Sequence, residues 1–491
     1  MTQPQHKEPS LLDSLIPIVV LVALLFTSVM VYGSDSSSGP NQIVLLLGMA
    51  VSAIIGLKNG YTWKEIEQGM INGISISLGA LLILLAVGSL IGTWLLAGTV
   101  PTLIYYGLEI LNPAIFYAAT VVICAIVAMS IGSSWTTAAT VGVALIGIAK
   151  GMGMSEAVTA GAIISGAYFG DKVSPLSETT NLAPAVAGTD LFEHIKYMLW
   201  TTVPSIFLAL IIFGFIGFGS ADQVSNEQIA AMQGLLAEEF NLGLHMLVPL
   251  FVLLAMAIKK VPAFPSVGIG ALLGGVWAII FQPEVVSRVA EVDQASIGQA
   301  LTVVWVTLYD GVSFNTTDAN LNDLLSGGGM ANMLNTIWLV MCAMCFGAVL
   351  EKVGLLKRAV SAILKGAKSA GDMVTRTIFT CFGSNLITAD QYISIVMPGR
   401  MYKEEFEKRG LHQLNLSRSL EDGGTITSPL IPWNTCGAYM AGVLKVPTLE
   451  YAWFALFNLI NPVLAIIYAF LGIKILKLDP PKAYKPEAQA Q

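Results

Sequence analysis

The sequence predicts an all-α polytopic membrane protein built from two inverted-topology repeats, and three observations support this fold class. Of its 491 residues, 55% are hydrophobic and only 12% are charged, whereas soluble domains carry about 25% charged residues. Apolar runs close to the length that spans a bilayer recur along the whole chain. A set of short motifs also occurs twice in the same order, once in each half of the chain.

The apolar runs predict the transmembrane helices. The first run, Leu11–Tyr32, is too long for a secretory signal and lacks a small-residue cleavage site after it, so we interpret it as a retained span. Later runs approach the roughly 20 residues that cross a bilayer; they are Ile43–Leu57, Ile74–Ala97, Tyr197–Phe218, Leu244–Ile258, Met333–Leu350 and Tyr451–Leu476. We therefore expect a multi-pass protein of the cell membrane, in contact with the lipid bilayer.

Four pairs of segments indicate the duplication. They are "LIPIVVLVALL" with "LVPLFVLLAMA", "SIGSSWTT" with "CFGSNLIT", "GDKVSPL" with "GTITSPL", and Pro204 with Pro462, each of which follows an apolar segment. Since all four pairs keep the same order, we interpret residues 1–218 and 243–476 as two copies of one unit. Residues 219–242 are then an extracytoplasmic linker, and residues 477–491 a cytoplasmic tail.

Lys and Arg residues predict the orientation, because cytoplasmic loops carry an excess of them. If each copy has about five transmembrane helices and one re-entrant hairpin, the odd number of spans inverts the second copy. Of the 25 Lys and Arg residues, this topology leaves Lys150, Arg288 and Lys445 outside and Lys172 within the membrane, with all the others in the cytoplasm. It also predicts that both termini are cytoplasmic.

Each copy is expected to contain a polar hairpin tip followed by a broken helix. The tips lie near 132–137 and 383–388, and the breaks at 170–181 ("GDKVSPLSETTN") and 422–436 ("DGGTITSPLIPWNTC"). Each break contains proline, which cannot continue the helical hydrogen-bond ladder. Irregular backbone at membrane depth is tolerated where it is buried in protein or lines a wet cavity. Paired broken helices in inverted copies are typical of a transporter binding site near the midplane.

The charges of the first break need a specific explanation, because an Asp or Lys at the bilayer centre costs about 2.5–3.5 kcal/mol. One interpretation is a purely structural pair of Asp171 and Lys172 that fixes the break. Hydroxyl and amide side chains crowd the same segment, however, and hard cations prefer several oxygen ligands. We therefore expect Asp171 to hold Na+ and H+ alternately, with Lys172 as a charge partner or gate.

The second break is expected to differ, because Thr425 occupies the position of the first-copy aspartate. The acids nearby are Asp390, which we predict as the second Na+ ligand, and the adjacent Glu421 and Asp422. Either of the latter two could simply pair with Arg418 at the membrane edge. We favour that interpretation for Glu421, and a role in the site for Asp422.

The candidate ion-binding or substrate-binding residues share a polar side chain within a tip or a break. In the first copy they are Ser133, Ser134, Thr136, Thr137, Asp171, Lys172, Ser174, Ser177, Glu178, Thr179, Thr180 and Asn181. In the second copy they are Ser384, Asn385, Thr388, Asp390, Asp422, Thr425, Thr427, Ser428, Asn434 and Thr435. Glu178 is either a second acid of the site or faces a cytoplasmic vestibule. Asn434 and Thr435 are either ligands or stabilise the break.

The string "GDKVSPLSETTNLAPAVAGTDLFEHIKYM" resembles the signature of the NhaC-type sodium/proton antiporter family, and the resemblance extends to the duplicated architecture. Glu178 stands where the family more often has Asp. The resemblance implies a secondary transporter that exchanges Na+ for H+ by alternating access, without a cofactor. Because the family includes exchangers of malate and lactate and relatives proposed to move amino acids, the alternative is a cation-coupled exchanger or symporter of a small organic anion or amino acid.

Other functional classes are disfavoured. The sequence has no His-Glu-x-x-His helix, no evident intramembrane Ser–His pairing and no nucleotide-binding Gly-rich loop, so we expect no enzyme activity. A channel would need a continuous polar pore, which the short paired breaks do not predict. No basic patch indicates nucleic-acid binding. The sequence does not distinguish a monomer from a homodimer.

Overall fold

The computed structural model describes residues 6–221, 226–314, 316, 322, 324–364 and 369–478. Within these ranges the regular structure is helical, apart from the isolated β-bridges Val312–Gly327 and Leu411–Lys477. Eight of the described helices are long and apolar enough to cross a membrane, or up to ten if each of two bent pairs is one span. The chain is therefore a multi-pass, all-helical membrane protein, as the apolar runs predict.

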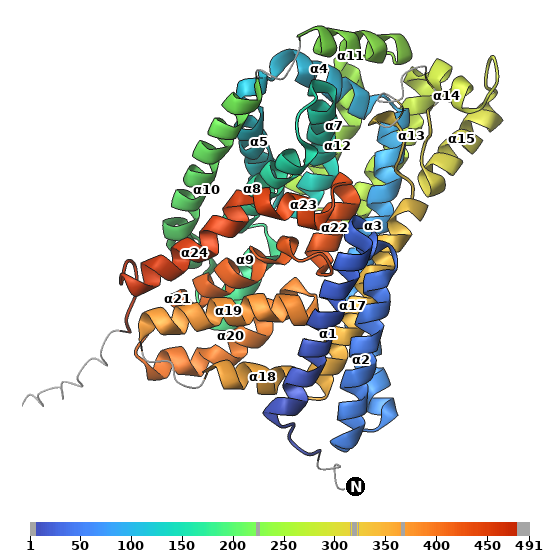
Figure 1. The fold of residues 1–491 in the computed structure, drawn as a ribbon. Coiled ribbons are helices and arrows are strands. Elements are labelled where there is room, and N and C mark those ends of the chain that lie inside the picture. Colours follow the sequence, from blue (N-terminus) through green and yellow to red (C-terminus); the bar gives the residue numbers. More distant parts are fainter. Residues whose placement is uncertain are drawn as a thin grey trace, which may run out of the picture.

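Among the described residues, the first half of the chain contains ten α-helices (Figure 1). They are α1 (Leu11–Tyr32), α2 (Pro40–Lys58), α3 (Trp63–Leu96), α4 (Thr99–Ile110), α5 (Phe116–Ile131), α6 (Ser134–Thr137), α7 (Val143–Met152), α8 (Glu156–Val173), α9 (Glu178–Ala187) and α10 (Leu191–Ala221). Capping boxes begin α1 at Ser10 and α3 at Thr62. In each, the cap and a carboxylate three residues later satisfy backbone N–H groups that the first helical turn leaves free.

The second half continues with α11 (Asn226–Glu239), α12 (Val248–Ile258), α13 (Ala263–Phe281), α14 (Pro283–Val289), α15 (Ile297–Asp310), α17 (Leu334–Lys352), α18 (Leu355–Leu364), α19 (Ala370–Thr388), α20 (Gln391–Lys408), α21 (Gln413–Leu420), α22 (Thr435–Leu444), α23 (Thr448–Tyr451) and α24 (Leu456–Phe470). The predicted linker 219–242 is thus largely helical. Its residues 222–225 lie outside the described residues, as does the predicted tail from residue 479 onward.

Two groups of helices lie side by side (Figure 1). The first group includes α1, α2, α3, α13 and α17, and its helices approach closely at small residues: a Cβ added at Gly73 of α3 would lie 2.5 Å from Cβ of Ala348 in α17. The second group includes α5, α8, α10, α19, α20, α21 and α24. There a Cβ at Gly170 of α8 would lie 2.3 Å from the carbonyl oxygen of Ala125 in α5. The predicted hairpins and breaks lie in or beside this second group.

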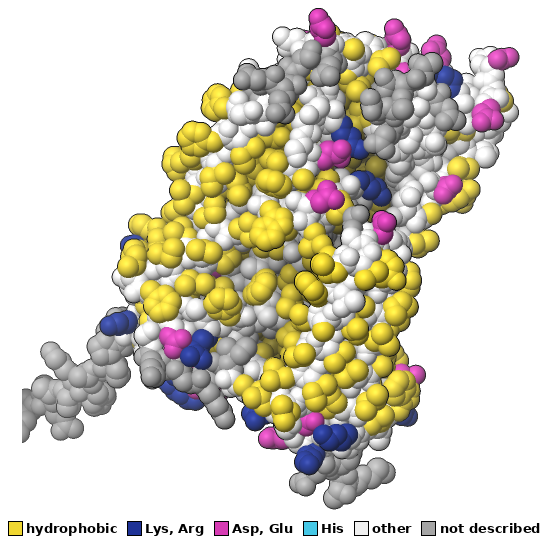
Figure 2. Space-filling view, in the orientation of Figure 1, with side chains coloured by type: hydrophobic (Ala, Val, Ile, Leu, Met, Phe, Trp, Pro, Cys, Tyr) yellow, Lys and Arg dark blue, Asp and Glu magenta, His cyan; other side chains and the backbone are white. Residues whose placement is uncertain are grey.

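The surface has the character that a bilayer requires. Figure 2 shows hydrophobic side chains over much of the middle of one face, while most charged side chains of that face lie toward its two ends. Such an apolar belt matches contact with hydrocarbon. The cytoplasmic location of the termini stays a prediction.

The structure places the turns of the two predicted hairpins differently. In the first half, Gly132 adopts a left-handed conformation (φ 75°) between α5 and α6, inside the predicted tip 132–137. The predicted tip near 383–388 falls on the last turns of α19, and the chain turns directly after it, at Ala389 (φ 57°). The reason is Asp390, whose Oδ1 accepts a hydrogen bond from the Ile393 backbone N at 2.8 Å and so begins α20.

The arms of the first hairpin do not by their length reveal whether it is re-entrant. Pro113–Ile131 and Ser134–Met152 each have 19 residues and are apolar enough to span. Re-entrant geometry and inverted topology therefore stay predictions.

The helix interruptions fall within or at the edges of the segments expected from the sequence. In the first, α8 ends at Val173 and α9 begins at Glu178, so that the non-helical part is 174–177. In the second, α21 runs into a π-helical turn, Glu421–Thr425, then a 3-10 turn, Ser428–Leu430, before α22 begins.

Candidate functional site

Asp171 lies in the last turn of α8 with its carboxylate directed at the start of α6. Its Oδ2 accepts hydrogen bonds from the Ser134 backbone N at 3.2 Å and from Ser134 Oγ at 2.8 Å. The side chain is only 7% exposed, and Oδ1 has no hydrogen-bond partner among the described residues. Buried polar atoms normally have a partner. A carboxylate with one oxygen fixed and the other open is therefore a suitable ligand for a hard cation.

The other tip hydroxyls mainly support the start of this helical segment. Ser133 Oγ accepts hydrogen bonds from the Thr136 backbone N at 3.2 Å and from Thr136 Oγ1 at 3.0 Å, and Thr137 Oγ1 donates to the Ser133 carbonyl at 3.0 Å. Ser133 is thus the N-cap, and Ser134 is the tip residue that contacts the carboxylate of Asp171.

The polar residues of the first break satisfy its own backbone. Thr180 Oγ1 donates toward the carbonyl oxygens of Asp171 and Lys172, at 3.2 and 3.1 Å. Asn181 Nδ2 reaches the carbonyls of Pro175 and Ser177, at 2.9 and 2.6 Å. Further contacts come from Ser174, whose Oγ accepts from the Leu176 N, and from Ser177, whose Oγ accepts from the Thr180 N and contacts Thr179 Oγ1. These side chains hold α8 and α9 together across the break.

Glu178 is exposed at the start of α9, and its Oε2 accepts a hydrogen bond from Tyr392 Oη of α20 at 2.5 Å. No hydrogen bond joins it to Asp171 within the described residues. Of the two roles expected for Glu178, this position favours the vestibule.

A buried ion pair joins the two breaks. Lys172 Nζ pairs with Asp422 Oδ1, and both side chains are fully buried. Asp422 also accepts a hydrogen bond from Asn461 Nδ2 of α24 at 2.7 Å, and Thr201 Oγ1 of α10 lies 3.4 Å from each of its oxygens. A buried charge is tolerated when it is paired and its remaining lone pairs are satisfied. Asp422 therefore acts as the partner of the lysine.

Neutral side chains hold the second break. Asn385 Nδ2 donates to the Gly424 carbonyl at 2.6 Å and to Thr427 Oγ1 at 3.0 Å, while Asn434 Nδ2 donates to Asn385 Oδ1 at 3.1 Å. Ser428 Oγ donates to Gln391 Oε1 at 2.9 Å. The Thr435 N donates to the Ala389 carbonyl at 2.8 Å. For Asn434, these contacts favour the break-stabilising role.

Asp390 is 3% exposed and caps α20, and the hydrogen bonds described here do not join it to Asp171. The neighbouring Thr388 Oγ1 donates to the Ser384 carbonyl at 2.9 Å. The hydroxyls of Ser384 and Thr425 are buried without a hydrogen-bond partner in the described part of the chain. The two predicted Na+ ligands thus belong to separate hydrogen-bond clusters.

The structure adds residues that the sequence interpretation missed. Thr201 and Asn461 contact Asp422, and Gln391 contacts Ser428. Glu421 is fully buried, and neither of its carboxylate oxygens has a hydrogen-bond partner among the described residues. The sequence does contain a signal for Thr201 and Asn461. Each is a polar residue within an apolar run, Thr201 three residues before Pro204 and Asn461 directly before Pro462.

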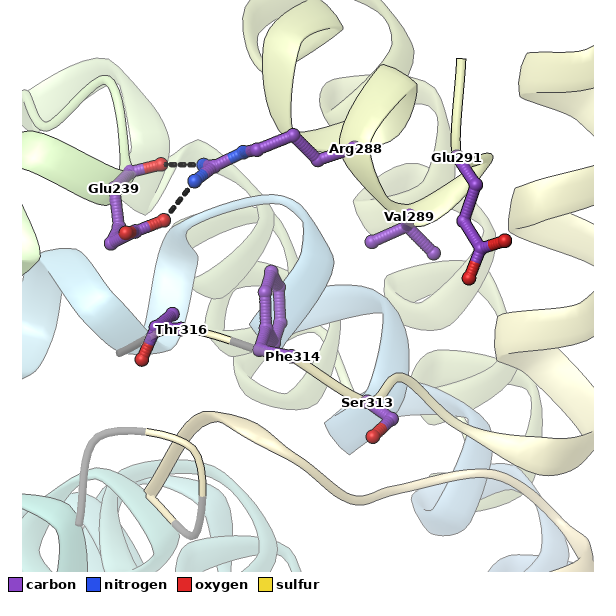
Figure 3. A pocket seen from close by; sticks show the side chains of 7 residues that line it. All are labelled: Glu239, Arg288, Val289, Glu291, Ser313, Phe314 and Thr316. Carbon is purple, nitrogen blue, oxygen red and sulfur yellow. Dashed lines mark hydrogen bonds and ion pairs between the residues drawn. The ribbon is translucent and has the colours of Figure 1, made fainter. Parts of the chain in front are cut away.

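Two cavities lie away from the breaks, beside α14 and α15. One, of about 230 Å³, is lined by Glu239, Arg288, Val289, Glu291, Ser313, Phe314 and Thr316, and Arg288 pairs there with Glu239 (Figure 3). The other, of about 750 Å³, lies between α15 and the segment that follows it. None of the predicted site residues lines either cavity. The buried polar contacts of the breaks, rather than these cavities, define the candidate site.

The described residues contain no group of three or more His, Cys, Asp and Glu side chains arranged to hold a metal ion. A Na+ site at Asp171 would therefore draw on hydroxyl or backbone oxygens besides the carboxylate.

Comparison with known proteins gives consistent results. The sequence profile of the Na+/H+ antiporter family matches residues 166–473, which include both breaks. The chain is 36% identical to the Na(+)/H(+) antiporter NhaC of Alkalihalophilus pseudofirmus, over 94% of this chain and 96% of that protein.

Two similar relatives carry names that mention organic solutes. The chain is 36% identical to the malate-2H(+)/Na(+)-lactate antiporter of Bacillus subtilis, over 94% of this chain and 95% of the relative. It is also 36% identical to the arginine/ornithine antiporter ArcD of Halobacterium salinarum, over 99% of this chain and 96% of the relative. Similar overall identity thus accompanies different named cargoes.

Proposed function

The chain belongs to the Na+/H+ antiporter family, as its resemblance to NhaC-type proteins indicates, and we propose that it exchanges Na+ for H+ across the cell membrane at Asp171. The observation that carries this assignment is the buried carboxylate of Asp171, with Oδ2 held by Ser134 and Oδ1 open. No other acid among the predicted site residues combines burial with an unpartnered oxygen in this way.

Exchange follows from competition for this one carboxylate. An ionised carboxylate away from water needs a compensating cation or proton. Na+ can supply the charge at Oδ1, and a proton at the same group neutralises it. The Lys172 ammonium does not neutralise Asp171 in place of Na+ or the proton, because its charge is compensated by Asp422. Arrival of Na+ therefore releases the proton, and arrival of a proton releases Na+.

Alternating access requires that the site open to one side at a time, and the two broken helices provide the parts for it. The Lys172–Asp422 pair links the end of α8 to the π-helical turn after α21. Movement of one break is thereby coupled to movement of the other.

The test uses purified protein in proteoliposomes with a preset pH gradient and an internal pH dye. Addition of Na+ alone is expected to move protons in the direction opposite to the Na+ flux. K+ at the same concentration serves as the ionic control. Proton movement that is identical with and without Na+ contradicts the proposal.

A second candidate is cation-coupled exchange of a small organic anion or amino acid. The observation that favours it is the equal, 36% identity to the malate–lactate and arginine/ornithine antiporters. In the same vesicles, malate, lactate and arginine with ornithine are each added after Na+. Absence of proton movement with Na+ alone, followed by proton movement when one solute is added, supports this candidate. Asp171 then binds the coupling ion.

A further inference from the structure

Two aromatic side chains, one from each half of the chain, stack beside the residue that holds Asp171. Trp135 follows Ser134 in α6, and its ring centroid lies 4.0 Å from that of Tyr439 in α22, with an angle of 19° between the ring planes. Tyr439 is fully buried, and its Oη donates a hydrogen bond to the Trp135 carbonyl at 3.0 Å. The second half of the chain therefore reaches the tip of the first hairpin through this tyrosine.

The helical segment that carries Trp135 is short and is supported by α22. α6 has four residues and continues into a π-helical turn, Ala138–Gly142. Such a turn departs from the regular helical hydrogen-bond pattern and often lies at a functional site. Besides the hydrogen bond from Tyr439, the close approach of Leu444 comes from α22: its Cδ2 would lie 3.3 Å from a Cβ added at Gly142. α22 thus contacts the chain both before the π-helical turn and at its end.

The start of α22 is held by the turn of the second hairpin. The Thr435 N donates to the Ala389 carbonyl at 2.8 Å, and Cys436 Sγ donates to Gln391 Oε1 at 2.7 Å. A hydrogen-bonded helix of ten residues transmits a displacement from one end to the other as a rigid element. α22 therefore connects the turn between α19 and α20 to the hairpin tip that holds the Asp171 carboxylate.

We propose that Tyr439 is a positioning residue for Na+ binding at Asp171. The inference rests on the proposed Na+ site and deepens it, because it names the residue of the second half that orients this site. The backbone N and Oγ of Ser134 hold Asp171 Oδ2, and Tyr439 holds the carbonyl of the next residue, Trp135. A ligand that is fixed before the ion arrives binds it more tightly than one that must first be ordered. Loss of the Tyr439 hydroxyl should therefore weaken Na+ binding without removing any Na+ ligand.

The test uses Tyr439→Phe, which keeps the stacked ring and removes only the hydroxyl. Tyr402→Phe in α20 is the matched control, since it removes a buried hydroxyl that contacts Thr380 Oγ1 at 2.7 Å and the Arg376 carbonyl at 3.2 Å. Glu404→Gln, on the exposed surface of α20, is the surface control. Calorimetric titration of the purified protein gives the Na+ concentration for half-saturation, and reconstituted vesicles give that for half-maximal flux. Both should rise about twofold to tenfold in Tyr439→Phe, with the maximal rate little changed, and stay constant in the two controls.

A second comparison separates positioning from a purely structural role. Ser134→Ala removes the Oγ contact with Asp171. If Tyr439 acts through the Ser134 segment, Tyr439→Phe should raise the Na+ concentration for half-saturation by a smaller factor in the Ser134→Ala background than in wild type, because coupled residues have non-additive effects. A purely structural role would lower the melting temperature and leave the Na+ concentration for half-saturation unchanged.

The outcomes distinguish this inference from the proposed function. An unchanged Na+ concentration for half-saturation in Tyr439→Phe overturns the inference, and so does an equal rise in Tyr402→Phe. An equal fold-change of Tyr439→Phe in both backgrounds also overturns it. Wild type that binds Na+ without moving protons overturns the proposed exchange instead, and the binding comparison then decides about Tyr439 by itself. Wild type that binds no Na+ overturns both.

Discussion

The two helix breaks have the same need for hydrogen-bond donors but differ in the charges they carry. Both leave backbone carbonyl groups without helical partners in a buried region. In the first break, the hydroxyl of Thr180 serves the carbonyls of Asp171 and Lys172. The amide of Asn181 also donates to carbonyls of the first break. The second break likewise uses amides and hydroxyls: Asn385 donates to the Gly424 carbonyl, Asn458 to the Ile426 carbonyl at 2.8 Å and Thr427 Oγ1 to the Gly423 carbonyl at 2.6 Å. Side chains thus donate to carbonyl groups in both breaks, but only the first break contains a cationic side chain, that of Lys172.

The difference in charge divides the work between the breaks. The first contributes Lys172 and the carboxylate with an open oxygen at Asp171, while the second contributes Asp422 as counter-charge to the lysine. Two related segments thus form one asymmetric site, in which one side holds the ion and the other side neutralises the lysine. Substitutions at matching positions should therefore have unequal effects.

The largest difference is expected between Asp171→Asn and Thr425→Val, which change matching positions of the two breaks. Asp171→Asn should reduce Na+-driven proton flux to the level of protein-free vesicles. The neutral amide neither ionises to bind Na+ nor takes up a proton in its place. Thr425→Val should retain measurable flux, since the carboxylate remains. Dye-reported flux per amount of reconstituted protein checks both, with Glu404→Gln as control. Sodium-driven flux at the wild-type rate in Asp171→Asn would exclude the assignment.

The next effect concerns the ion pair that joins the breaks. Lys172→Met leaves Asp422 buried and uncompensated, which should lower the free energy of unfolding by about 3–5 kcal/mol. The double variant Lys172→Met with Asp422→Asn removes both charges and should recover most of that loss. Denaturant unfolding in detergent measures the cycle. Additive losses in the double variant would show that the two side chains do not interact.

Much of the fold could be predicted because membrane insertion leaves strong local signals. Apolar length predicts the spans, and proline with polar residues predicts the segment of the first break. The polar string "GSNLIT" locates the second turn only approximately, because the cap at Asp390 decides where α20 begins. The pairing of Lys172 with Asp422 spans 250 positions and depends on how the halves pack, which a single sequence does not contain.

Glu421 shows the same limit from another side. In the sequence it lies three residues after Arg418, a spacing that suggests a surface ion pair. In the structure, Arg418 stacks on Tyr197 and both Glu421 oxygens are left without partners. Tertiary packing, rather than the local pattern, thus turns an apparent edge residue into a buried acid.

A smaller difference in the free energy of unfolding is expected between loss of the Asn385 amide and loss of the Thr180 hydroxyl, which donate to carbonyls of the second and first breaks. Asn385→Ala should lower the free energy of unfolding by about 1–3 kcal/mol, because the Gly424 carbonyl loses its donor in a closely packed region. Thr180→Val should lie at the low end of that range, since the Asp171 carbonyl keeps the hydrogen bond from the Ser174 N at 3.1 Å. Unfolding of both variants under the same conditions gives the order, and a larger loss for Thr180→Val would contradict it.

The smallest structural effect is expected for Asp390→Asn, which tests whether the second half contributes a Na+ ligand. Asp and Asn are comparable N-caps, so the variant should keep α20 and change the free energy of unfolding by about 0.5 kcal/mol or less. The charge alone is removed. If Asp390 binds Na+, the Na+ concentration for half-maximal flux should rise while stability stays constant. Because the hydrogen bonds of Asp390 lie within α20 and not with Asp171, an unchanged Na+ dependence would assign Asp390 to capping and leave the ion site to the first break.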